Sequence, residues 1–297
     1  MEKKYKEITL RAPAKINLFL EITGKRSDGY HDIESIMMSL DELFDTITLK
    51  KAPKGKISLD CRTHECQRPG DVEEIPEGEN LAFRAAEIFL EELAKRGEKD
   101  IPGIKIEIEK RIPVRAGLGG GSADAGAVLR GLNSLFEDVF TSEELCAMGL
   151  RLGADVPFCT SGEKCALCLG VGEKMTSIKN RVQLHGIITA EKGEKPSTAA
   201  AYKELDAADK RKTRSSAELV RHLEAGDETK AISEFYNVFE GVCDYGNGGR
   251  EILEKSGAST VLLSGAGPSV FAFFDGDEEK EKAAAELASC GFAVYKF

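Results

Sequence analysis

The chain has 297 residues, of which 41% are hydrophobic and 31% are charged, and its formal net charge is −10 at pH 7. This length favours two domains, and this composition favours a globular protein with a substantial core. The negative charge argues against a nucleic acid or an anionic membrane as partner, because both reward a basic surface.

No apolar run approaches the length of a membrane span, and the N-terminal residues Met1–Glu7 lack the apolar core of a signal peptide. We therefore expect a cytoplasmic protein.

The first part of the chain predicts strands and helices that alternate irregularly. Residues Lys15–Ile22 alternate between polar and apolar side chains, which is typical of a half-buried strand. Further strands are predicted at Ile33–Leu40, Thr46–Lys50 and Ile104–Lys110, and helices at Leu81–Arg96 and from Thr141, the first residue of a capping box, to about Gly153. This mixture predicts α+β packing rather than a regular parallel βαβ array.

The pattern restarts after about residue 180. Strands are predicted at Val182–Thr189, Thr260–Leu263, Ser269–Phe274 and Phe292–Lys296, helices at Ser197–Leu205, Ser216–Glu224, Thr229–Tyr236, Arg250–Lys255 and Glu278–Ala288, and an exposed loop at Asp206–Arg214. The strand–strand–helix–strand ending resembles half of a ferredoxin-like sandwich. We therefore expect one domain over residues 1–180 and a second over residues 181–297.

Two groups among the eight cysteines resemble metal sites. Cys165 and Cys168 form a single C-x-x-C pair, and Cys61, His64 and Cys66 offer three ligands in a polar loop. A structural zinc site generally needs four ligands at recognisable spacing. We therefore predict reduced cysteines in a reducing compartment.

A glycine-rich stretch, Gly117–Gly126, lies between the predicted strand Ile104–Lys110 and a segment whose apolar residues recur with helical spacing. Glycines at such a junction permit positive φ and let a ligand approach bare N–H groups. The following helix adds unpaired donors and the positive end of its dipole. The stretch therefore predicts an anion site, most simply for phosphate, and a tight turn from strand to helix is the alternative.

Common nucleotide motifs do not match this stretch. A Walker loop needs Gly-Lys-Ser/Thr where this chain has Gly121-Ser122-Ala123, and the dinucleotide fingerprint fails because position 122 is serine. The catalytic and metal-binding motifs of protein kinases are absent as well.

Three segments in order carry a family resemblance: Arg11–Leu18, Gly117–Ser122 and Leu263–Ser269. Together they resemble the three signatures of the GHMP small-molecule kinase superfamily, and the resemblance spans essentially the whole chain. It implies an α+β fold in which an N-terminal ribosomal-protein-S5-domain-2-like ATP-binding domain is followed by a C-terminal ferredoxin-like α/β sandwich, with the active site in the cleft between them. It also implies ATP and Mg²⁺ as cofactors and phosphoryl transfer to a hydroxyl group.

Further segments narrow the resemblance: Lys25–His31, Gly153–Phe158, Gly170–Lys174, Ser197–Tyr202 and Asn237–Glu240. They resemble a member of the superfamily that phosphorylates the 2-hydroxyl of a cytidine-diphosphate-linked methylerythritol, a step of non-mevalonate isoprenoid precursor biosynthesis. Asp28–His31 is the main discriminator, because the resemblance assigns it to the cytidine end of the substrate. The alternatives are another GHMP kinase, acting on homoserine or mevalonate, and a nucleotide-binding module without catalysis. The protein would be a monomer or a homodimer.

The resemblance assigns the catalytic residues. Asp155 matches the family's catalytic aspartate and would accept the hydroxyl proton, while Lys15 would orient Asp155 and stabilise negative charge on the attacking oxygen. Taken alone, Asp155 would be a turn residue that bonds nearby backbone and Lys15 a solvated charge. Asn17 lies two residues beyond Lys15, on the same face of the strand, so it is expected to reach the same site and bind substrate.

The expected ATP site consists of the anion loop and one asparagine: Gly117, Leu118, Gly119, Gly120, Gly121, Ser122 and Asn80. Ser122 would contact a phosphate or the Mg²⁺ ion. Asn80 resembles the family's residue near adenine, and it is equally a candidate helix N-cap.

The expected substrate site, besides Asn17 and Asp155, contains Tyr30, His31, Gly153 and Gly265. Tyr30 would stack on the pyrimidine and His31 would hydrogen-bond it, although His31 could also be a surface histidine. Gly265 lies in a glycine-rich segment that would close over the substrate side, or simply form a hairpin.

The chain departs from the family pattern at two positions. Ala123 stands where many relatives carry a second hydroxyl, and Arg115 stands where a small residue is expected. A phosphate or metal contact would then be missing or supplied by water, and Arg115 would either add charge toward the triphosphate or point to solvent.

Overall fold

The computed structural model describes residues 6–63, 75–190, 198–207, 213–242 and 247–297. Contacts divide the chain into two compact units. The first unit comprises residues up to Lys15 together with Phe44–Val114 and Gly119–Glu163, and the second comprises Ile16–Leu43, Arg115–Leu118 and Lys164–Phe297. The domain boundary predicted at residue 180 stays a prediction. No described helix is both long and apolar enough to cross a membrane.

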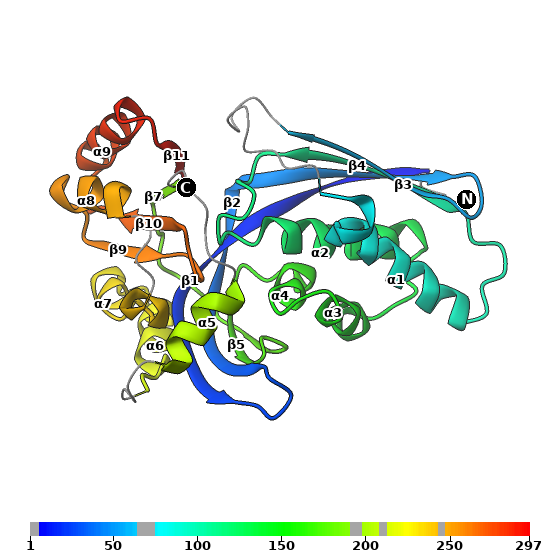
Figure 1. Cartoon of the computed structure of the whole chain (residues 1–297), viewed down its shortest axis with the longest axis horizontal. Helices are drawn as coiled ribbons and strands as arrows, with labels where there is room; N and C mark the ends of the chain where they lie inside the picture. The colour runs from blue at the N-terminus through cyan, green and yellow to red at the C-terminus, as the bar shows by residue number, and fades with distance from the viewer. Residues whose placement is uncertain (1–5, 64–74, 191–197, 208–212, 243–246) are drawn as a thin grey trace. The chain divides into compact units, whose positions relative to one another are not determined.

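The first unit is a sheet with helices packed on one face, as Figure 1 shows. Its sheet runs β3 (Ile57–Thr63), β4 (Gly103–Lys110), the C-terminal part of β2 (His31–Ala52) and the N-terminal part of β1 (Glu7–Lys25), with β3 parallel to β4 and β4 antiparallel to β2. Its helices are η1 (Glu77–Glu79), α1 (Leu81–Lys95), α2 (Gly120–Leu135), α3 (Ser142–Leu150) and α4 (Val156–Ser161). Helix α2 is the centre of this layer, because it packs against α1, α3 and α4 and is buried along most of its length.

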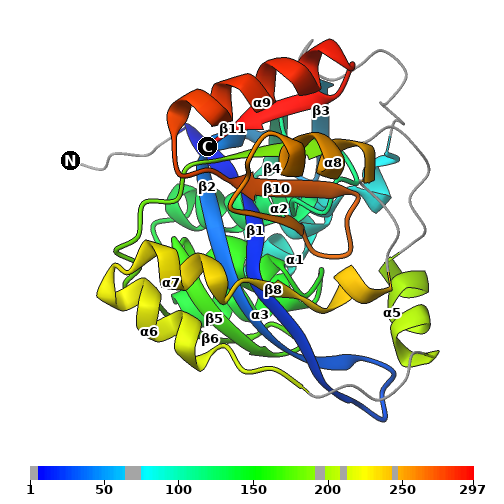
Figure 2. The ribbon, with the colours of Figure 1, turned by 90° about the vertical axis from the view of Figure 1, so that its left-hand side faces the viewer.

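The second unit contains an antiparallel sheet in the order β11 (Ala293–Lys296), β7 (Gly186–Ala190), β10 (Ser269–Phe273) and β9 (Thr260–Leu263). Helices α8 (Asn247–Lys255) and α9 (Asp277–Ser289) pack on it and lie together in Figure 2. The chain order β7, α8, β9, β10, α9, β11, with β7 and β10 in the middle of the sheet, is a ferredoxin-like split βαβ arrangement. The expected C-terminal sandwich is confirmed.

The remainder of the second unit is built on the other parts of the long strands. Strand β5 (Cys165–Gly170) pairs with the start of β2 and with β6 (Lys174–Ser177), and β8 (Tyr236–Asn237) pairs in parallel with β1. Helices α5 (Thr198–Ala207), α6 (Ala217–Ala225) and α7 (Glu228–Ser233) and the turn η2 (Val238–Gly241) complete it.

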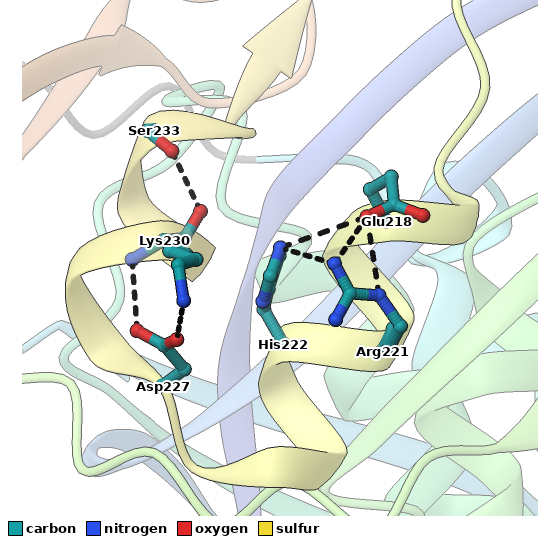
Figure 3. A network of polar contacts seen from close by, with 6 residues as sticks. All are labelled: Glu218, Arg221, His222, Asp227, Lys230 and Ser233. Carbon is teal, nitrogen blue, oxygen red and sulfur yellow. Dashed lines mark hydrogen bonds and ion pairs between the residues drawn. The ribbon is translucent and has the colours of Figure 1, made fainter.

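Helices α6 and α7 are held together by packing rather than by charge. Figure 3 shows that Glu218, Arg221 and His222 interact within α6, whereas Lys230 interacts with the N-cap residue Asp227 within α7. The residues buried on these two helices are Leu219, His222, Leu223 and Ala231. Apart from the buried His222, the drawn side chains are at least partly exposed, and such surface contacts each contribute little to stability.

Most predicted elements are present, and the α+β class is confirmed. The strand predicted over Val182–Thr189 begins only at Gly186, because its partner β10 ends opposite at Phe273. The helix predicted through Tyr236 ends at Ser233, and Tyr236 instead pairs with Phe19 of β1. The prediction of a loop over Asp206–Arg214 is wrong at its start, because α5 extends to Ala207. Ser197 and residues 208–212 lie outside the described residues.

The sequence patterns did not predict β3, β5, β6 and α4. Strand β5 contains the C-x-x-C pair, and no disulfide joins the described cysteines. No cluster of three or more potential metal ligands occurs among the described residues, and His64 and Cys66 are not among these.

Candidate active site

A buried lysine and a partly exposed aspartate form the centre of the site in the first unit. Lys15 lies on β1 with 4% of its side chain exposed, and its Nζ is 3.1 Å from Oδ2 of Asp155, whose side chain is 33% exposed. Asp155 is the N-cap residue of α4, yet its side chain makes no capping bond. The interpretation of Asp155 as a residue that bonds nearby backbone is therefore not supported. Its carboxylate faces a buried ammonium on one side and remains accessible on the other.

The second half of the anion loop lies against Lys15. Gly119 is the N-cap residue of α2 and has a φ of 69°, in the left-handed region that favours glycine. A Cβ on Gly119 would lie 2.9 Å from Cγ of Lys15 and 3.0 Å from its Cε. Both constraints require glycine, so the N-terminal turn of α2 approaches the lysine closely. No side chain caps α2, and the N–H groups of Gly120, Gly121 and Ser122 are therefore available to an anion in this turn.

Helix α2 also positions Asp155, because it crosses α4 at a glycine. A Cβ on Gly126 would lie 2.7 Å from the carbonyl carbon of Cys159 and 2.8 Å from the backbone nitrogen of Thr160. Near the same crossing, the Arg130 guanidinium donates a hydrogen bond to the Cys159 carbonyl, and burial lowers the pKa of Arg130. The anion loop and the predicted base are thus fixed by one helix. The run of small residues around Gly126 was the sequence signal for this close approach.

Asp45, Lys110 and Asp124 form a second charged group, a buried cluster that no sequence motif indicated. Lys110 at the end of β4 donates hydrogen bonds to both carboxylates, and its Nζ is 2.7 Å from Oδ2 of Asp124 on α2. Burial opposes the charged form of Lys110, but Asp124 and Asp45 outweigh it and raise the pKa of the ammonium group. Removing one partner of such a buried set typically costs about 3–5 kcal/mol, because it leaves an uncompensated charge.

The first half of the anion loop, Gly117 and Leu118, belongs to the second unit. Gly117 has a φ of 80°, and a Cβ there would lie 2.3 Å from the Ser264 carbonyl oxygen and 2.8 Å from that of Gly267. Ser264 Oγ donates a 2.9 Å hydrogen bond to the Gly117 carbonyl. The glycine-rich turn between β9 and β10 therefore supports Gly117. Leu118 is 1% exposed, so the residue as a whole is buried, and its role in ATP binding stays a prediction.

Asn237 fixes this turn in the second unit. Its Nδ2 donates hydrogen bonds of 2.8 Å to the Leu263 carbonyl and 2.7 Å to the Gly265 carbonyl, and its Oδ1 accepts from Phe239 N. The hairpin expected at Gly265 is thus confirmed, whereas its substrate role stays a prediction.

His31 lies in a small aromatic and charged group of the second unit. Its ring packs against Tyr202 with centroids 4.8 Å apart, and its Nε2 is 2.8 Å from Oδ1 of Asp206. Lys25 reaches the other oxygen of Asp206, and this ammonium, followed by His31, lowers the pKa of that carboxyl. The His31 side chain is only 9% exposed, so it is not a solvated surface histidine. Tyr30 is 64% exposed.

The remaining predicted residues have structural partners. Asn17 Nδ2 donates to Ser35 Oγ at 2.9 Å, and the Gly153 carbonyl accepts from Val156 N at the start of α4. Asn80 is the N-cap residue of α1, where its side chain accepts from Ala82 N and Phe83 N, so the cap interpretation is confirmed. The ligand roles of all three stay predictions.

The two departures from the family pattern occupy different surroundings. Ala123 is 2% exposed, so a hydroxyl at this position would face the interior. Arg115 is exposed and has a φ of 57°, which disfavours a non-glycine residue and explains why a small residue was expected.

Comparisons with known proteins identify the family. The GHMP kinases N-terminal domain matches residues 80–163, and the GHMP kinases C-terminal domain matches residues 250–293. A curated 4-diphosphocytidyl-2-C-methyl-D-erythritol kinase from Caldicellulosiruptor saccharolyticus is 38% identical over 283 residues, which cover 94% of this chain and 92% of the relative. The chain belongs to this family of GHMP kinases.

Solved structures agree with that assignment. A crystal structure of 4-(cytidine 5'-diphospho)-2C-methyl-D-erythritol kinase superposes with a TM-score of 0.73 at 29% identity, and covers 97% of this chain and 98% of its own. Streptococcus pneumoniae phosphomevalonate kinase gives a TM-score of 0.72 at only 14% identity, covering 99% of each chain. The GHMP kinase fold is thus common to both, and sequence identity separates them. As a member of the family, the chain is an ATP-dependent small-molecule kinase.

Proposed function

We propose that this GHMP kinase transfers the γ-phosphoryl group of ATP to the 2-hydroxyl of 4-diphosphocytidyl-2-C-methyl-D-erythritol. The observation that carries the proposal is the Lys15–Asp155 pair, with Gly119 packed on the lysine, in a chain whose curated relatives bear that substrate's name. The hydroxyl oxygen forms a bond to the γ-phosphorus, the bond from that phosphorus to the bridging oxygen breaks, and ADP leaves. The hydroxyl proton passes to Asp155.

In this proposal Asp155 is the general base and Lys15 its positioning charge. The buried Lys15 ammonium holds one carboxylate oxygen, so the exposed part of Asp155 is oriented toward the hydroxyl. The same ammonium stabilises negative charge that develops on the attacking oxygen. Asn17, two residues beyond Lys15 in the sequence, would be a further substrate contact.

The anion loop holds the triphosphate through its N–H groups, and Asn80 lies near the adenine. Mg²⁺ would enter the site together with ATP. This ion prefers oxygen ligands and usually binds through one or two protein groups, phosphates and water. The half-buried Ser122 hydroxyl would be the protein contact of this ion, and ATP phosphates and water would supply its other ligands. Bound Mg²⁺ supplies charge neutralisation between the phosphates.

The cytidine end binds at the group formed by His31, Tyr202 and Asp206, with Tyr30 as an exposed ring beside it. Asp206 holds Nε2 of His31, and therefore sets which ring nitrogen faces a pyrimidine. The reduced cysteines predicted from the sequence would suit the cytoplasmic location that we propose for this reaction.

A substrate panel tests the proposal. The purified protein is incubated with ATP, Mg²⁺ and, in separate reactions, the cytidine substrate, homoserine or mevalonate, and ADP release is followed. Turnover of the cytidine substrate alone is expected. Turnover of homoserine or mevalonate without the cytidine substrate would replace the proposed substrate, and ATP binding without turnover on any compound would indicate a catalytically silent module.

A further inference from the structure

The buried cluster of Asp45, Lys110 and Asp124 joins the end of β4 to the first turns of α2, next to the anion loop. Lys110 bridges the two carboxylates. A Cβ added to Gly120 would lie 3.0 Å from Cγ2 of Ile112 and 3.4 Å from Nζ of Lys110. The cluster therefore lies directly behind the turn whose N–H groups face the anion.

Asp45 holds the backbone that leads into this turn through hydrogen bonds. Its Oδ1 accepts hydrogen bonds from the main-chain nitrogens of Arg111 and Ile112, and its Oδ2 accepts from Lys110 Nζ. Both oxygens of Asp45 are thus occupied by donors. In contrast, Asp124 uses Oδ2 for Lys110, while its buried Oδ1 has no hydrogen-bond partner among the described residues.

We propose that Asp45, Lys110 and Asp124 are positioning residues for nucleotide binding, which hold the Gly119–Ser122 turn in its anion-binding conformation before ATP arrives. This inference rests on the proposed use of that turn for the triphosphate. The residues touch no phosphate themselves. They act by fixing both ends of the segment Arg111–Gly120, so that less conformational freedom is lost on binding.

Electrostatics supports a compact, nearly neutral cluster. Burial, followed by the charge of Asp45, raises the pKa of Asp124 to about 7, although Lys110 opposes this shift. Two thiols in weaker electrostatic contact complete the titratable surroundings, Cys61 on β3 and Cys159 on α4, and burial raises the pKa of both. A protonated Asp124 leaves one ammonium and one carboxylate behind the phosphate site.

The two aspartates allow a matched test. Replacement by asparagine preserves the hydrogen bonding at Asp124 but disrupts it at Asp45. In Asp124→Asn, the amide oxygen can still accept from Lys110, and the NH₂ group takes the place of the unpartnered oxygen. In Asp45→Asn, either amide orientation places NH₂ against a donor, namely Lys110 Nζ or the two main-chain N–H groups. A lost hydrogen bond to a charged group corresponds to a roughly tenfold to hundredfold change in an equilibrium constant.

The experiment measures the Kd of a non-hydrolysable ATP analogue by calorimetry, the KM and kcat for ATP, and thermal unfolding of each variant. Asn133→Leu is the control, since Asn133 is a buried polar residue near the other end of α2 that bonds Phe140 N and O. We expect Asp45→Asn to raise the analogue Kd and the ATP KM at least about tenfold and Asp124→Asn to leave both within about twofold. Asn133→Leu should lower stability and leave the Kd unchanged.

An unchanged analogue Kd in folded Asp45→Asn would overturn the positioning role, as would an equal loss of affinity in Asn133→Leu. If Asp45→Asn does not fold, Asp124→Leu, which removes one of the two Lys110 acceptors but keeps the hydrogen bonds from Asp45 to the main chain, must raise the Kd instead. A wild-type Kd in that variant also overturns the role. Binding of the ATP analogue requires no phosphoryl acceptor. The Kd values therefore test the positioning role even if the proposed acceptor substrate is wrong.

Discussion

Replacing Gly126 with alanine tests whether the crossing of α2 and α4 positions the catalytic pair. The added Cβ would lie 2.7 Å from main-chain carbon of Cys159, and ordinary contact begins at 3.4 Å, so α4 must move by about 0.7 Å. Main chain cannot rotate away as a side chain can. Since Asp155 is the N-cap residue of α4, its carboxylate moves relative to Lys15, from which it is now 3.1 Å.

A misplacement of about 1 Å costs about 10²-fold in rate, so we expect Gly126→Ala to lower kcat by roughly 10- to 100-fold. Overpacking should lower stability by about 1–3 kcal/mol, or a few degrees in Tm. The KM for ATP should change little, because the anion loop ends at Ser122, about one helical turn before Gly126. Steady-state kinetics at saturating substrates and thermal unfolding measure both effects.

The matched control is Gly131→Ala on the same helix. Its Cβ would meet only the ends of two flexible side chains, Leu49 Cδ1 at 2.6 Å and Leu10 Cδ1 at 2.7 Å. This variant should lose some stability but keep kcat within about twofold. A wild-type kcat in Gly126→Ala, or an equal loss in Gly131→Ala, would refute the argument that the crossing fixes Asp155.

Two further predictions concern the other groups. His31→Ala should raise the KM for the cytidine substrate by about tenfold or more, with a smaller change in kcat, because it removes a buried ring and a hydrogen-bonding group. An unchanged KM would show that the pyrimidine binds elsewhere. Burial raises the pKa of Asp124 to about 7, so the folded state holds its proton more tightly than the unfolded state does. This contribution stabilises the fold below about pH 4 and is lost as the pH rises to about 7. The free energy of unfolding in urea should therefore fall for the wild type relative to Asp124→Asn between about pH 4 and pH 7. The same dependence on pH in both proteins would contradict the raised pKa of Asp124.

The elements that the sequence predicted well are those with strong local signals. The capping box at Thr141 and the helical periodicity of α2 depend on neighbouring residues, and both are present. Strand β5 was missed because it pairs with β2, more than a hundred residues away, and β6 in turn forms a hairpin with β5. Similarly, the late start of β7 at Gly186 depends on where its partner β10 ends, which periodicity within β7 cannot reveal.

The candidate site shows the same division. The family motifs indicated Lys15 and Asp155, and the structure brings them into contact. Long-range partners were not predictable from motif spacing. Asp206 meets His31 across 175 residues, and Lys110 meets Asp45 across 65. A charged residue in a predicted loop and a lysine at the end of a strand are each ordinary surface features until folding brings them against a partner.

Phosphorus NMR of the reaction mixture tests the central claim most directly, because it reports where the phosphoryl group goes. With ATP, Mg²⁺ and 4-diphosphocytidyl-2-C-methyl-D-erythritol, the wild-type protein should produce one new phosphomonoester signal on the intact cytidine diphosphate compound, together with ADP. Asp155→Asn should bind ATP normally and form this product more slowly by orders of magnitude, since it lacks the base. Release of inorganic phosphate without a phosphomonoester, or normal product formation by Asp155→Asn, would contradict the account.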